Sequence, residues 1–114
     1  MRIESEELAD GILKVRLHGR MDIAGVDAIA MQFTALTAPV GRRVIVDLSG
    51  VDFLASIGVR ALLQNARAMS LRGGSMAVCC AKPVVTQVLE SAGVGNVVPV
   101  SADLTAARAT LREA

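Results

Sequence analysis

Apolar side chains follow two different periods along the chain. Residues 12–18 alternate apolar and polar side chains, as a β-strand with one buried face does. Residues 26–33 and 59–69 instead place apolar side chains three and four positions apart, which is the spacing of one buried helical face. Residues 43–47 and 75–80 are short runs rich in apolar residues, as expected of strands covered on both faces. The pattern therefore predicts a mixture of strands and helices.

Turn and cap signals order the first half of the chain. Weak alternation over residues 2–7 predicts a short edge strand, and Asp10-Gly11 is a turn that joins it to the strand ending at His18 as a hairpin. Asp22 follows the next turn, where its side chain is placed to cap the first helix. A hairpin therefore precedes the first helix.

The second half alternates strands and helices. Pro83 opens the third helix and Gly93 closes it, residues 97–100 form a short strand, and Ser101 caps a last helix. The predicted order is β-β-α-β-α-β-α-β-α. It corresponds to an α/β fold with a mixed, mostly parallel sheet packed against helices, built as a single domain over residues 1–114.

The central segment combines a strand, an elbow and a helix. The strand ends at Asp47, residues 48–55 form a short polar elbow, and Ser56 opens a helix that stops at Gly73-Gly74. A helix N-terminus presents unpaired N–H groups and a partial positive charge, so a phosphate on Ser56 would be tolerated there. Serine is also a common N-cap, so the position alone leaves both roles open.

Two polar residues of this segment have an expected structural role. Asp47 and Ser49 are predicted to brace the elbow by accepting its backbone N–H groups. Asp52 is expected to be exposed and close to any interface that the elbow makes, whereas Phe53 is the elbow residue expected in the core.

Composition excludes some partners and suggests a compartment. The formal net charge is +1 and the aromatic residues are Phe33 and Phe53, so neither a basic nucleic-acid surface nor a base-stacking platform is predicted. The apolar runs are only of strand length, so no membrane insertion is expected. The polar, acidic N-terminus is unlike a secretory signal, which predicts a cytoplasmic protein.

The sequence offers little for catalysis, metal binding or cofactor binding. Cys79 and Cys80 are adjacent, a poor arrangement for a disulfide, and no histidine or second cysteine pair suggests a metal site, so both are predicted as small core residues. A hydrolase based on Ser56 and His18 lacks a Gly-x-Ser-x-Gly elbow. A phospho-accepting receiver based on Asp47 lacks the acidic pair that would hold magnesium. No phosphate-binding loop predicts a nucleotide cofactor.

Several stretches together resemble the STAS domains, and specifically the anti-sigma factor antagonists. Residues 47–51 read DLSGV, and residues 54–59, LASIGV, carry the leucine, serine, glycine and valine of the family signature. Residues 17–22, LHGRMD, are similar to a leucine-x-glycine-x-leucine-aspartate segment of the family. Residues 81–94, AKPVVTQVLESAGV, occupy the place of a family helix that ends in a glycine turn. The resemblance covers essentially the whole chain.

The resemblance implies a binding switch without enzymatic activity of its own. In this family the unphosphorylated protein binds an anti-sigma factor and so frees a sigma factor. The anti-sigma factor is often an ATP-dependent serine kinase that phosphorylates the antagonist, and a serine phosphatase reverses the modification. Ser56 occupies the position of the family's phospho-acceptor. Ala55 and Ile57 depart from the family pattern, which has an acidic residue before the acceptor and a second hydroxyl residue after it.

The expected partner surface comprises the elbow and the start of the second helix. Its predicted residues are Ser49, Asp52, Ala55, Ser56, Ile57, Gly58 and Arg60. Gly58 is expected to allow close approach of a partner or a phosphate. An alternative within the same family is a STAS subunit of another complex, such as a membrane-lipid or anion transport system.

Overall fold

The computed structural model describes residues 1–111, so the last three residues of the predicted domain lie outside it. The expected order of strands and helices is confirmed. The strands are β1 (Arg2–Glu7), β2 (Leu13–Met21), β3 (Arg43–Leu54), β4 (Ser75–Cys79) and β5 (Val100–Ser101). The helices are α1 (Ile23–Thr37), α2 (Ser56–Leu71), α3 (Pro83–Ser91) and α4 (Leu104–Thr110), with a 3-10 turn at Val94–Asn96.

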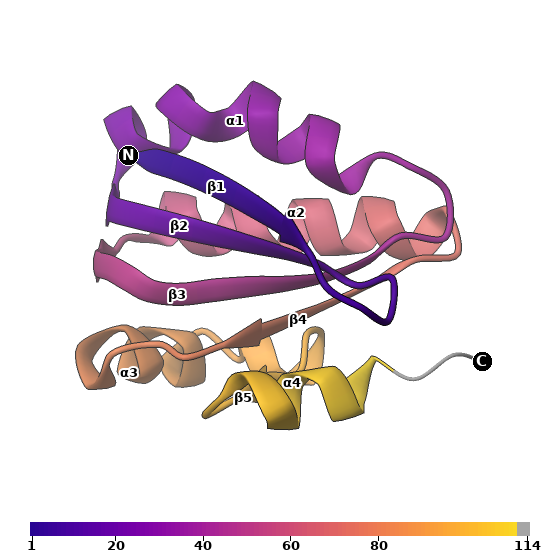
Figure 1. Cartoon of the computed structure of the whole chain (residues 1–114). Coiled ribbons are helices and arrows are strands. Elements are labelled where there is room, and N and C mark those ends of the chain that lie inside the picture. Colours follow the sequence, from indigo (N-terminus) through magenta and orange to yellow (C-terminus); the bar gives the residue numbers. More distant parts are fainter. Residues whose placement is uncertain (112–114) are drawn as a thin grey trace.

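The strands form one sheet in the order β1-β2-β3-β4-β5 (Figure 1). β1 pairs antiparallel with β2, and each later strand pairs in parallel with its predecessor. β1 is an edge strand whose side chains are mostly exposed and charged. Because sequential parallel strands need a crossover, a helix lies between each of these pairs.

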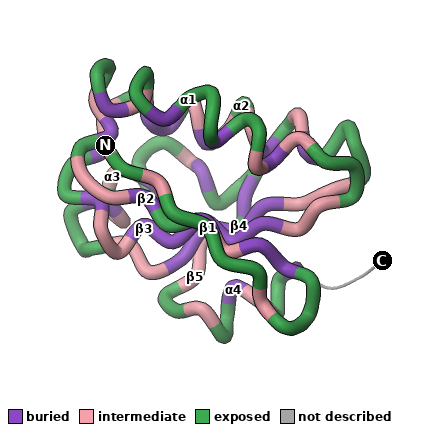
Figure 2. The backbone as a smooth tube through the Cα atoms, turned by 45° about the horizontal axis from the view of Figure 1, so that its top comes forward, coloured by how far each residue is buried: buried purple, intermediate pink, exposed green. Residues whose placement is uncertain are grey.

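Helices cover both faces of the sheet (Figure 2). α1, α2 and α3 enclose the larger core, in which Leu17, Phe33, Val46 and Leu62 are almost completely buried. α4 lies on the opposite face and covers a smaller cluster. The buried members of that cluster are Ile12, Ile45, Ala77, Cys79, Ala107 and Leu111. Beyond α4, this second face carries charged side chains from β1 and β2.

The predicted elbow at residues 48–55 is mostly strand. β3 continues to Leu54 because β2 also continues, to Met21, and the two strands stay paired. Two register shifts interrupt their ladder. As a result the buried residues Leu48, Val51 and Leu54 are spaced three apart, and the alternation by which a strand is recognised in sequence is lost.

Helix starts agree with prediction in one case and differ in another. Asp22 caps α1 as predicted, since its Oδ1 accepts the N–H of Gly25 at 2.8 Å. Ser101 does not cap α4, because it belongs to β5; Asp103 takes that role and accepts the N–H of Ala106 at 2.8 Å. The strand predicted at 97–100 begins only at its last residue.

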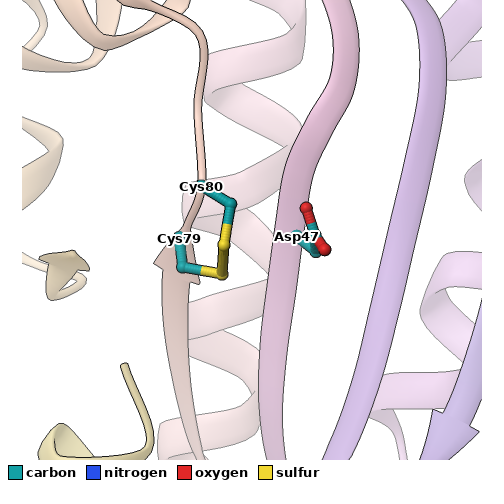
Figure 3. A group of neighbouring side chains, drawn as sticks. All are labelled: Asp47, Cys79 and Cys80. Atoms are coloured by element: carbon teal, nitrogen blue, oxygen red, sulfur yellow. A yellow bond between two sulfur atoms is a disulfide. The ribbon is translucent and has the colours of Figure 1, made fainter. Parts of the chain in front are cut away.

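Cys79 and Cys80 are joined by a disulfide, contrary to the prediction (Figure 3). Neighbouring strand residues normally point to opposite faces of a sheet. Cys80 follows the last residue of β4 and has a φ of +69°, so its side chain is turned back toward that of Cys79. Cys79 is buried, as predicted, and Cys80 is half-buried.

Candidate partner-binding site

The start of α2 is the centre of the predicted site. Ser56 is the first helical residue and is exposed, while Ala55 occupies the cap position. Ser56 therefore opens the helix as predicted, and the alternative role of N-cap, which the sequence left open, is not the one it takes. Within residues 1–111 no side chain caps α2. The carbonyl oxygen of Ala55 accepts the N–H groups of Gly58 and Val59 at 2.9 and 3.1 Å. The Ser56 hydroxyl thus stands at the positive end of a helix without a side-chain cap.

Gly58 fixes this helix start against the sheet. A Cβ atom at Gly58 would lie 2.7 Å from Leu54 Cδ1, 2.8 Å from Met21 Cβ and 3.0 Å from the Met21 carbonyl oxygen. The same carbonyl accepts the N–H of Ala55 at 3.1 Å. The close approach expected at Gly58 is therefore made by the protein's own strands. It places Ser56 just beyond the carboxyl ends of β2 and β3.

Asp47 makes the contact expected of a bracing residue. It is only 7% exposed, and its Oδ1 accepts the N–H of Ser49 at 2.8 Å. The hydroxyl of Ser49 accepts a hydrogen bond from Nη2 of Arg16 at 3.1 Å. This contact places Ser49 on the sheet face opposite α2. Ser49 is thereby separated from Ser56, although both were predicted for the same partner surface.

An ion pair connects β3 to α3. Asp52 is exposed, and its Oδ1 lies 2.5 Å from Nζ of Lys82, the residue before α3. The hydrogen bond and the charge of Lys82 lower the pKa of Asp52 from its ordinary value of 3.8. Asp52 is therefore ionised at neutral pH, and a negative charge stands near the start of α2.

Phe53 is not a core residue. Its side chain is 40% exposed, and the guanidinium of Arg20 lies over its ring, 4.2 Å from the centroid. The neighbouring Val51 and Leu54 are buried in its place. Phe53 and Arg20 were not predicted as site residues, yet they provide an apolar and cationic surface at the same end of the sheet.

A hollow between α2 and α3 lies beside Ser56. It is open to solvent, has a volume of about 350 Å³ and is lined by Ser56, Val59, Val88, Ser91 and Ala92. The sequence prediction included no α3 residue. Local sequence patterns could not indicate Val88 or Ser91, because α2 and α3 meet only in the folded chain.

The predicted partner residues differ in accessibility. Ser56, Asp52 and Arg60 are exposed, Ser49, Ala55 and Ile57 are half-buried, and Gly58 is buried. Arg60 is one helical turn after Ser56, so the two side chains share a face of α2. None of the helices within residues 1–111 is long and apolar enough to cross a membrane.

Comparisons with known proteins agree on one family. The profile of the STAS domain matches residues 5–107. The chain is 30% identical over 105 residues to BtrV of Bordetella bronchiseptica, whose name marks it as a candidate anti-sigma factor antagonist, with 92% of the chain and 90% of BtrV aligned. It is 30% identical over 91 residues to the anti-sigma F factor antagonist of Paenibacillus polymyxa, covering 79% of the chain and 78% of that protein. The crystal structure of an anti-sigma factor antagonist from Mycobacterium paratuberculosis superposes with a TM-score of 0.87 at 23% identity, covering 98% and 94% of the two chains.

Proposed function

Because the chain belongs to the STAS domain family, we propose that it is an anti-sigma factor antagonist, which binds an anti-sigma factor and so releases a sigma factor. The observation that carries this proposal is the exposed Ser56 at the start of α2, beside the open hollow between α2 and α3. The chain acts by binding and not by catalysis, and it works in the cytoplasm with its partner.

Phosphorylation of Ser56 is the proposed switch. A phosphoserine carries roughly −1.5 to −2 charges at neutral pH. The positive end of α2 and the guanidinium of Arg60, one turn on, favour that charge, so the fold accepts the modification. The partner is an ATP-dependent serine kinase that also serves as the anti-sigma factor, and a serine phosphatase reverses the modification.

The proposed docking surface has three parts, and Ser56 lines the first of them. It consists of the hollow toward α3, the exposed Asp52 beside Lys82, and the exposed ring of Phe53 under Arg20. A partner that packs against the serine hydroxyl would have to desolvate a phosphate placed there or withdraw from it. The negative charge of Asp52 adds to this cost when the partner surface is itself acidic.

Capture from the native cells tests the proposal. The tagged, unphosphorylated full chain should retain a protein with an ATPase-type kinase domain. An added sigma factor should compete with the chain for binding to that protein. Addition of ATP should release this protein and add about 80 Da to the antagonist at Ser56, the mass of one phosphoryl group. Capture of a membrane-lipid or anion transporter instead would favour the alternative STAS role and overturn the proposal.

A further inference from the structure

A cluster on the second face of the sheet is not explained by the partner switch. Asp47 on β3 and Cys79 on β4 are register partners on adjacent parallel strands, and the Cys79–Cys80 disulfide lies directly beside the Asp47 carboxylate (Figure 3). One ligand atom from each of Asp47, Cys79 and Cys80 can be chosen so that all three atoms lie within 4.8 Å of one another. This places two sulfurs and a carboxylate oxygen together at the end of β4.

A small tetrahedral cation would fit within the 4.8 Å limit only after the disulfide bond between the two sulfurs is opened. Zinc binds sulfur at about 2.3 Å and carboxylate oxygen at about 2.0–2.2 Å, so its ligand atoms stand roughly 3.5–4 Å apart. Asp47 and Cys79 are held by the sheet, whereas Cys80 follows β4 and is half-buried. The Cys80 side chain is therefore the one that can move when the disulfide opens, and it also gives solvent a route to the cluster.

Two cationic side chains lie close to the carboxylate of this cluster. The Oδ2 atom of Asp47 lies 4.0 Å from Nζ of Lys14 and 3.9 Å from Nε of Arg16. Two thiolates and one carboxylate around a divalent cation leave a net charge of −1. Arg16 offsets this charge, while Lys14 also pairs with Glu6 at 3.8 Å. The other oxygen of Asp47 is oriented by the N–H of Ser49, as the carboxylates that ligate metals usually are.

We propose that the dithiol form of Cys79 and Cys80, together with the Asp47 carboxylate, binds a thiophilic divalent cation, with zinc as the best match. Soft thiolate ligands select such cations, and three protein ligands leave one tetrahedral position for water. The site is independent of the partner surface, because it lies on the sheet face opposite α2.

The disulfide seen in the structure is the oxidised form of this site, which does not bind the metal. Thiol–disulfide exchange with a small dithiol supplies two electrons and two protons, which convert the disulfide into two thiols while the dithiol becomes a disulfide. Metal binding then replaces the two thiol protons, which are released to solvent, and forms two metal–sulfur bonds. Oxidation by a small-molecule disulfide reverses the sequence and expels the metal.

Cobalt spectroscopy on the full chain tests the site. The protein, reduced with a phosphine and then freed of it, is titrated with Co²⁺ and afterwards with Zn²⁺. The dithiol form should show a thiolate-to-cobalt charge-transfer band that Zn²⁺ abolishes, and the disulfide form should show none. Absence of the band in the dithiol form, or equal metal affinity in both forms, would overturn the proposal.

Single substitutions test the contribution of individual ligands to metal binding. Cys80→Gly removes one thiol without strain, since glycine adopts a φ of +69° readily, and it should abolish the two-thiolate band. Asp47→Asn keeps an oxygen for the Ser49 N–H and should weaken Zn²⁺ binding at least ten-fold. Asp52→Asn makes the same change at an exposed carboxylate elsewhere and should leave the affinity unchanged. Unchanged affinity in Asp47→Asn would refute the three-ligand site, and unchanged affinity in Cys80→Gly would refute the dithiol.

Discussion

Asp52 and Lys82 are joined by an ion pair that links the end of β3 to the start of α3, with Oδ1 and Nζ 2.5 Å apart. Of the two elements, α3 also lines the hollow beside Ser56. Both side chains of the pair are exposed. Such exposed pairs contribute little to folding, since solvent screens them. Their position makes them available to a partner that approaches Ser56.

Substitution of Asp52 or Arg60 should therefore affect partner binding and not stability. Asp52→Asn and Arg60→Gln are each expected to weaken binding of the anti-sigma factor, while the melting temperature stays close to that of the parent. Calorimetric titration and thermal unfolding measure the two quantities. Arg67→Gln, the same change on an exposed residue of α2 two turns further on, is the matched control. Full affinity in both test variants would place the interface elsewhere.

Charge at Ser56 should control binding. Ser56→Ala is expected to bind the anti-sigma factor constitutively in the presence of ATP, and Ser56→Glu to bind at least ten-fold more weakly, about 1.4 kcal/mol. Both should retain the circular dichroism spectrum of the parent. Ser70→Glu, at the other end of α2, controls for added charge on this helix. If the two Ser56 variants and the parent bound equally under ATP, Ser56 would not be a switch.

Gly58 should be intolerant of even one added methyl group. In Gly58→Ala the new Cβ meets Met21 and Leu54 at 2.7–3.0 Å, so we expect a loss of about 1–3 kcal/mol in the free energy of unfolding. Urea denaturation measures this loss. Gly95→Ala is the matched control, because no neighbouring atom in the described part of the chain lies within 4 Å of its added Cβ. Its stability should be nearly that of the parent. Equal stability of the two variants would contradict the packing described for α2.

Acid should destabilise the fold mainly through the helix cap Asp22, because the exposed ion pairs of Asp10 and Asp52 contribute little. A backbone hydrogen bond from Gly25 lowers the pKa of Asp22, and side-chain hydrogen bonds from Arg108 and Lys82 lower those of Asp10 and Asp52. A carboxyl with a lowered folded pKa stabilises the fold above its ordinary pKa of 3.8, and this contribution is lost as the pH falls through the folded value. The melting temperature should therefore drop below about pH 4.

A variant of Asp22 tests the origin of that drop. Asparagine caps helices about as well as aspartate but does not titrate, so Asp22→Asn should match the parent at neutral pH and lose less stability in acid. Thermal unfolding followed by circular dichroism across the pH range measures both. An acid profile identical to that of the parent would exclude Asp22 as a contributor.

We expect the partner, and not this chain, to bind the nucleotide. Gly73-Gly74 follows the end of α2, so it does not place backbone N–H groups at the start of a helix, where phosphates are held. Calorimetric titration of the isolated chain with ATP or GTP should show no binding tighter than about millimolar. Micromolar affinity of the chain for ATP or GTP would contradict the proposal that only the partner binds nucleotide.

Local periodicity predicted most of the fold. The buried face of α2, with Val59, Leu62, Ala66 and Met69, lies where the three-and-four spacing indicated. The length of β3 could not be predicted in this way. Its second half is a strand because β2 pairs with it through an irregular register, which is a property of two segments and not of either sequence alone.

The candidate site was predictable only along one segment of chain. The place of Ser56 at the start of α2 followed from the apolar helical spacing after it. Val88 and Ser91 come beside it only through the packing of α3. Phe53 looked like a core residue because it is large and apolar, whereas the irregular end of β3 turns Val51 and Leu54 inward instead. The disulfide was missed because adjacent residues in a strand point apart, and the turn of the backbone at Cys80 could not be read from its sequence.

The charged side chains of β1 limit how this protein can associate. A bare sheet edge is a template for another strand, and strands that present charges there resist edge-to-edge pairing and aggregation. On β1, Arg2, Glu4, Glu6 and Glu7 are exposed, and the opposite edge strand, β5, has only two residues. Strand addition is therefore disfavoured at both edges, so a partner of this protein is expected to bind through side chains on its surface and not by extending the sheet.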